Sequence, residues 1–133
     1  MGLLGSIFGS SNDKSSKEEI KKNINWVPLT SLEQLETIKQ QSETEAIFIF
    51  KHSTRCGISS MVIKQFEKLF KEEHQKIKVF YLDLLSYRNI SDEVGYAFQV
   101  MHQSPQLLVI RNGVSVHNAS HYEITQTQIS RFI

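Results

Sequence analysis

The sequence is poor in cysteine, in proline and in net charge: of its 133 residues, one is cysteine and two are proline. A single cysteine cannot form a disulfide within the chain, which argues against a secreted domain held by disulfides and favours the reducing cytoplasm. The 15 basic residues are nearly balanced by 14 acidic ones. Because nucleic-acid binding usually needs a basic excess, we expect no nucleic-acid partner.

Long hydrophobic runs are also missing. No stretch approaches the roughly 18 apolar residues that a membrane-spanning helix needs, and the N-terminus lacks the charged and apolar regions of a secretion signal. We therefore expect neither a membrane partner nor secretion. Hydrophobic residues still make up 40% of the chain, which is enough to build the core of one domain without disulfides or metal.

The chain divides into a tail and one domain. Residues 1–23 are rich in Gly, Ser, Lys and Asn, and this composition predicts a flexible N-terminal tail. Residues 24–133 form the expected domain. It begins with a short strand over 24–29, which Pro28 confines to the edge of a sheet. A helix follows, with Thr30 or Ser31 as its expected N-cap.

The middle of the chain alternates buried strands with helices. The apolar run Ala46–Phe50 predicts a central strand with parallel neighbours. After a loop over His52–Arg55, apolar residues recur every three or four positions and predict a helix ending near His74. Cys56 falls in the first turn of that helix.

Further elements follow from the same patterns. They are a buried strand over Ile77–Leu82, a helix carrying Val94, Ala97, Phe98 and Met101 with Ser91 as its expected cap, a hairpin from Leu107–Ile110 through Asn112-Gly113 to Val114–Val116, and a last helix from about Thr125. The Asn-Gly pair predicts a type I′ turn. The resulting order, β-α-β-α-β-α-β-β-α, predicts an α/β domain of the thioredoxin-like fold, with a central mixed sheet flanked by helices.

Cys56 is the candidate reactive residue. A cysteine at the start of a helix faces unpaired backbone N–H groups and the positive end of the helix dipole, and both favour thiolate over thiol. The neighbouring Arg55 adds positive charge, and His52 adds more if its ring turns inward. Most lone cysteines are inert small hydrophobes, but the position after a central strand and beside an arginine favours a reactive one.

The segment His52–Ser59, HSTRCGIS, with Ser104-Pro105 and Ser120-His121 further along the chain, resembles the monothiol bacilliredoxins, the redox proteins of the bacillithiol system. The most specific part of the likeness is Lys51–Ile58. The likeness runs from about Trp26 to the end of the chain and excludes the tail. It implies that Cys56 is the nucleophile that removes bacillithiol from S-bacillithiolated client proteins. Bacillithiol would then be a co-substrate, with no tightly bound cofactor. Gly57 departs from the family, which commonly has proline there.

A wider set of candidate residues is expected to stabilise the thiolate or bind substrate. They are Arg55, Thr54, His52, Gly57, Ser59, Ser104, Pro105, Ser120 and His121. Ser104-Pro105 matches the cis-proline loop of thioredoxin-like proteins, which faces the cysteine. Ser120 and His121 are expected where the second hairpin strand returns toward the site; ordinary surface residues are an equal alternative.

Ser59 stands where a CxxC motif has its resolving cysteine. Serine cannot form a disulfide, so a mixed disulfide on Cys56 would wait for an external thiol. The Ser59 hydroxyl either stabilises the thiolate or only helps to start the helix. Phe50 occupies the position of a buried aspartate in dithiol thioredoxins, so no buried proton acceptor is implied there.

Two other functions stay open at this point. Cys56-Gly57-Ile58-Ser59 is close to the Cys-Gly-Phe-Ser motif of monothiol glutaredoxins, which carry iron–sulfur clusters, although the proline loop and the segment after the hairpin differ. The other is a non-catalytic module that keeps the fold for partner binding. The histidines have no zinc-ligand spacing, so we expect no metal site.

Overall fold

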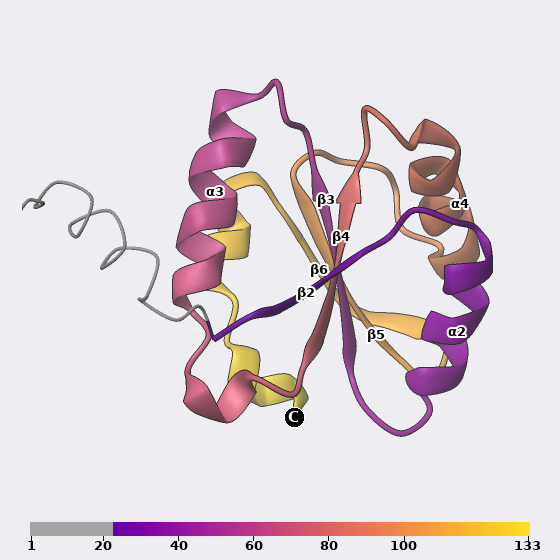
Figure 1. Cartoon of the computed structure of the whole chain (residues 1–133), viewed down its shortest axis with the longest axis horizontal. Helices are drawn as coiled ribbons and strands as arrows, with labels where there is room; N and C mark the ends of the chain where they lie inside the picture. Colours follow the sequence, from indigo (N-terminus) through magenta and orange to yellow (C-terminus); the bar gives the residue numbers. More distant parts are fainter. Residues whose placement is uncertain (1–22) are drawn as a thin grey trace, which may run out of the picture.

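The computed structural model describes residues 23–133, which form a five-stranded sheet with helices on both faces (Figure 1). Residues 1–22, most of the expected tail, lie outside the described residues. The elements are β2 (Asn25–Pro28), α2 (Glu33–Gln41), β3 (Ile47–His52), α3 (Gly57–Lys68), η1 (Glu72–His74), β4 (Lys78–Asp83), α4 (Arg88–Phe98), β5 (Gln106–Arg111), β6 (Val114–Ser120), η2 (His121–Gln126) and η3 (Ile129–Phe132). The η elements are short 3₁₀ helices.

The sheet has the strand order β2-β4-β3-β5-β6. Strands β2, β4 and β3 run parallel, whereas β5 is antiparallel to both β3 and β6. The mixed sheet and its central β3 confirm the predicted α/β class, and β2 lies at the edge, as Pro28 indicated. Asn112 and Gly113 both have positive φ, 56° and 77°, as a type I′ turn requires.

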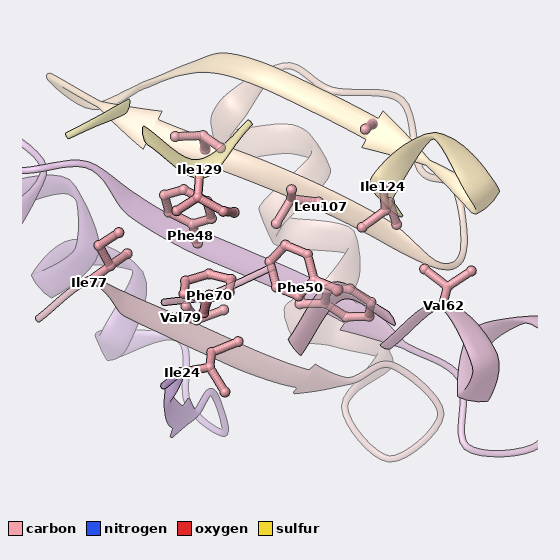
Figure 2. Packing of buried hydrophobic residues seen from close by; sticks show 13 residues of the cluster. Ile24, Phe48, Phe50, Val62, Phe70, Ile77, Val79, Leu107, Ile124 and Ile129 are labelled. Carbon is pink, nitrogen blue, oxygen red and sulfur yellow. The ribbon is translucent and has the colours of Figure 1, made fainter. Parts of the chain in front are cut away.

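Two apolar clusters fill the two sides of the sheet. Alternate residues of β3 divide between them: Phe48 and Phe50 face α3, while Ile47 and Ile49 face α2 and α4. Figure 2 shows the first cluster, in which phenylalanines of β3 meet Val62 of α3 and residues of the C-terminal segment. This division matters for the site, because it continues through the last residues of β3.

The C-terminal segment differs from its prediction. The helix expected from about Thr125 is wrong, because η2 and η3 are short 3₁₀ turns. The hydroxyl of Thr127 donates to the backbone carbonyl of Ile124 at 2.7 Å, and the hydroxyl of Thr125 donates to the backbone carbonyl of Tyr122 at 2.7 Å. Such local bonds compete with the i→i−4 ladder of an α-helix, so the chain makes tight turns.

Two predicted helix caps are also wrong. In α2 the N-cap is Leu32, and neither Thr30 nor Ser31 caps it with its side chain. Instead, the side-chain oxygen of Gln34 accepts bonds from the backbone N–H groups of Thr30 and Ser31, at 2.7 and 3.0 Å. Ser91 lies inside α4 and is buried, because this helix already begins at Arg88.

Two helix ends fall earlier than expected. α3 ends at Lys68 rather than near His74, because the chain becomes extended at Lys71 before η1. α4 ends at Phe98, so Met101 lies in the following loop and is 83% exposed. Within residues 23–133, none of the helices has the length and apolar character that crossing a membrane requires.

Candidate functional site

The site begins where β3 leads into α3, at the top of Figure 1. Cys56 is the N-cap of α3, with an extended backbone at φ −103° and ψ 122°. Its N–H donates to the carbonyl of Ser53 at 3.2 Å, and its own carbonyl accepts from the N–H of Ser60 at 3.0 Å. The thiol is free and half-buried. The helix-start position inferred from the sequence is therefore the observed one.

Ser59 and His52 form a buried pair beneath this turn. The Ser59 hydroxyl lies 2.7 Å from Nδ1 of His52, and it accepts the backbone N–H of Ser53 at 3.1 Å. Burial lowers the pKa of His52, with Asp83 opposing, so the imidazole is neutral at pH 7. With the proton on Nε2, the Ser59 hydroxyl donates to His52 and is engaged away from the sulfur; with the proton on Nδ1, the hydroxyl is free to donate elsewhere.

The other residues of the turn are more open. Thr54, Arg55 and Gly57 are exposed beside Cys56. A Cβ built on Gly57 would meet no atom within 4 Å, and its φ lies outside the left-handed region. The site therefore does not need glycine at this position for steric reasons.

The residues just before β5 and just after β6 lie at the same end of the sheet. Gln106 pairs with Lys51 of β3 and with Ser120 of β6. Pro105 therefore lies beside the end of β3, and the N–H of His121 donates to its carbonyl at 3.0 Å. The Ser104–Pro105 peptide bond is cis, and His121 has a positive φ of 57°.

The side chains on this edge differ in exposure. Pro105 is buried, Ser104 and Ser120 are half-buried, and His121 is exposed. The Ser104 hydroxyl oxygen is buried and finds no hydrogen-bond partner among residues 23–133. The helical turn η2, which begins at His121, packs against α3. The structure thus brings both predicted segments, Ser104-Pro105 and Ser120-His121, to the end of the sheet at which Cys56 lies.

Lys51 and His102 were missed by sequence reasoning. Lys51 is fully buried on β3, and its Nζ lies 3.2 Å from Nδ1 of His102 and donates to the carbonyl of Ser91 at 3.1 Å. Burial lowers the pKa of Lys51 to about 8, with Asp92 opposing. The one signal available in the sequence was the alternation of side chains along a strand. Had the predicted strand been extended by two residues, Lys51 would have been placed on the same buried face as Ile47 and Ile49.

A separate cavity of about 640 Å³ lies at the opposite end of the sheet. Its lining includes Ala46, just before β3, Ile77, just before β4, and Arg111, at the end of β5. Cys56 follows the other end of β3, so this cavity is no part of the cysteine site. Among the described residues, no group of three or more His, Cys, Asp or Glu side chains is arranged to hold a metal ion.

Solved structures share this architecture. A proposed oxidoreductase with a thioredoxin fold is 29% identical, with a TM-score of 0.67 over 80% of this chain and 91% of its own. A thioredoxin of Schistosoma mansoni is 17% identical, with a TM-score of 0.65 over 85% of this chain and 100% of its own. A thioredoxin of Malassezia sympodialis is 19% identical, with a TM-score of 0.63 over 80% of this chain and 86% of its own. The fold is therefore that of thioredoxin.

The family comparison covers the same region. The family described as Monothiol bacilliredoxin BrxC matches residues 27–129, which include Cys56, Pro105 and His121. The match spans the whole sheet except the first residues of β2. The chain thus belongs to the monothiol bacilliredoxin family.

Proposed function

We propose that the protein is a monothiol thiol–disulfide oxidoreductase that removes bacillithiol from S-bacillithiolated proteins through a mixed disulfide on Cys56. The observation that carries this proposal is the arrangement at the start of α3. A free, half-buried cysteine occupies the N-cap position of the helix, and a buried serine takes the place of a resolving cysteine. Family membership and the thioredoxin fold support a redox function.

The first step transfers the small thiol. The Cys56 thiolate attacks the bacillithiol sulfur of the client's mixed disulfide, so a bond forms between these two sulfurs and the client cysteine leaves as a thiolate. In the second step a bacillithiol thiolate attacks the adduct on Cys56. This step releases oxidised bacillithiol disulfide and restores the Cys56 thiolate, so two bacillithiols are joined for each client reduced.

The protein's surroundings follow from this chemistry. Its partners would be S-bacillithiolated client proteins and free bacillithiol, and it would hold no tightly bound cofactor. Reduced bacillithiol is needed as a co-substrate, so we place the protein in the cytoplasm, where thiols are kept reduced. The small thiol would bind at the end of the sheet where Cys56, Pro105 and His121 lie.

Intact-mass analysis after mixing with a bacillithiolated client tests the proposal. We expect one bacillithiol adduct on Cys56, release of one equivalent of reduced client, and no further turnover until bacillithiol is added. Cys56→Ser is the control and should take up no adduct while keeping its fold, because serine is nearly isosteric but too weak an acid. Repeated turnover without any added small thiol would contradict the monothiol mechanism.

A further inference from the structure

The loop between α4 and β5 is held by polar contacts as well as by the partly buried Val100 and the buried Pro105. It covers residues 99–105 and ends at Pro105. Met101, in its middle, is 83% exposed, so its side chain does not anchor the loop. The carbonyl of Met101 accepts from the Gln106 side chain at 2.9 Å, which fixes one point close to β5.

Lys51 provides the long-range tie. Its Nζ donates to the carbonyl of Ser91 in α4 and lies 3.2 Å from Nδ1 of His102 in the loop. These partners are 40 and 51 residues away in sequence. The side chain is 0% exposed, whereas His102 is an exposed residue. One buried amine therefore joins the central strand, a helix and the loop.

The charged groups around this amine favour its donor role. Asp92 of α4 attracts the Lys51 ammonium, and the positive charge of Arg88 of α4 disfavours protonation of the His102 ring. The pKa of His102 is lowered, first by burial and then by Lys51 and Arg88, with Asp92 opposing. The imidazole is therefore neutral, and its Nδ1 can accept a hydrogen bond from the Lys51 amine.

We propose that Lys51 is a positioning residue for the reaction at Cys56, because it fixes through His102 the loop that carries Pro105 to the cysteine. The inference rests on the proposed function, in which this loop receives the substrate's mixed disulfide. Lys51 does not touch the reacting sulfur. Its effect is confined to reactions in which the substrate must be oriented against the loop, since positioning lowers the barrier only for a bound reactant.

Two reactions of the same thiol separate positioning from reactivity. Iodoacetamide is small and reacts with Cys56 without needing the loop, whereas single-turnover transfer from a bacillithiolated client needs it. In Lys51→Met we expect the transfer rate divided by the alkylation rate to fall about tenfold, which equals ~1.4 kcal/mol of lost positioning. His102→Ala should lower the ratio in the same direction, and the double variant should lower it no further than Lys51→Met does. Each single variant removes the contact between Lys51 and His102, and Lys51→Met also removes the bond to Ser91.

Lys78→Met is the matched control. It makes the same chemical change in the same sheet, on β4, at the end far from Cys56, where Lys78 faces Glu45 at 4.0 Å. Its ratio should equal that of the unmodified protein. An unchanged ratio in Lys51→Met, or full additivity of the two site variants, would overturn the proposal. If Lys51→Met does not fold, the exposed His102 supplies the test alone: an unchanged ratio in His102→Ala overturns it.

Hydrogen exchange gives a readout that needs no client. Backbone amides in residues 100–106 should exchange faster in Lys51→Met and in His102→Ala than in Lys78→Met. Failure of transfer in the unmodified protein would contradict the proposed function alone. Equal protection of the loop in all three variants would contradict the role of Lys51, whatever the client experiments give.

Discussion

The Nδ1 atom of His52 lies 2.7 Å from the hydroxyl oxygen of Ser59, and both side chains are buried beneath the turn that carries Cys56. Removing this hydroxyl in Ser59→Ala leaves the N–H of Ser53 and the ring of His52 without their partner. We expect a loss of about 1–3 kcal/mol in the free energy of unfolding, the usual cost of an unsatisfied buried group. Urea unfolding measures it. Ser60→Ala, one residue along the same helix, should change stability little, and equal losses in both variants would show that the pair is unimportant.

Ser59→Cys should create a CxxC protein. The new thiol lies one helical turn from Cys56, so an oxidant should close a disulfide between them, with a mass decrease of two hydrogens and loss of the external-thiol requirement for release of the adduct. Ser60→Cys, which carries the same extra thiol one residue further along the helix, is the matched control. A stable small-thiol adduct on Cys56 in Ser59→Cys, with no internal disulfide, would contradict this expectation.

Arg55→Ala should slow alkylation of Cys56 near neutral pH by about two- to fivefold, because one nearby positive charge is removed from an exposed, screened position. The measurement is the alkylation rate as a function of pH at low and at high salt, and the difference should shrink as salt is added. Lys64→Ala, an exposed charge further along α3, is the control. A profile unaltered in Arg55→Ala would show that the Arg55 charge does not affect the reactivity of Cys56.

Gly57→Pro should stabilise the protein by about 0.4–1 kcal/mol, because proline restricts the unfolded chain more than glycine does. Position 57 is the first residue of α3, where proline is favoured, and Cys56 already has the extended backbone that precedes proline. Thermal unfolding gives the stability. Gly57→Ala keeps the N–H that proline lacks, so slower alkylation in the proline variant than in the alanine variant would measure what that N–H contributes. Destabilisation by proline would mean that the N–H has a structural partner.

Stability should rise with pH between about 8 and 10 through Lys51. Its pKa is about 8 in the folded protein and 10.5 as the ordinary value, so in this window the unfolded chain binds more protons than the folded one. Unfolding then becomes less favourable as pH rises, by at most about 1 kcal/mol per pH unit. Above pH 10 the raised pKa of Tyr81 acts in the opposite direction.

Urea unfolding at several pH values measures this dependence as the difference between the unmodified protein and Lys51→Met. The difference removes the contributions of all other groups. A difference that stays constant between pH 8 and 10 would show that Lys51 keeps an ordinary pKa when folded.

The order of strands and helices could be predicted because it depends on periodicity. Runs such as Ala46–Phe50 carry the signal locally, and the Asn112-Gly113 turn needs only two residues. Helix ends were predicted less well, because they depend on side chains competing for backbone groups: Gln34 rather than Thr30 or Ser31 satisfies the start of α2. The threonine hydroxyls near residue 125 had the same effect on the expected last helix.

The position of Cys56 could also be predicted, since one strand and one helix define it. Lys51 could not be predicted as a buried residue, because a lysine after an apolar run usually marks the surface. Its partners are Ser91 and His102, and only the folded chain brings them near. Ser59 could be predicted in part. Its position in the first turn of the helix was evident from the sequence, whereas its hydrogen bond with His52 depends on the inward turn of that ring.

The last two residues of β3 also protect the register of the sheet. Lys51 turns its amine toward α4, and His52 turns its ring toward Ser59 of α3. A slip of β3 by one residue would exchange these faces, since side chains alternate along a strand. The ammonium would then enter the phenylalanine-rich side without its acceptors. The paired polar groups at the end of this strand therefore select the one alignment that also delivers Cys56 to the start of α3.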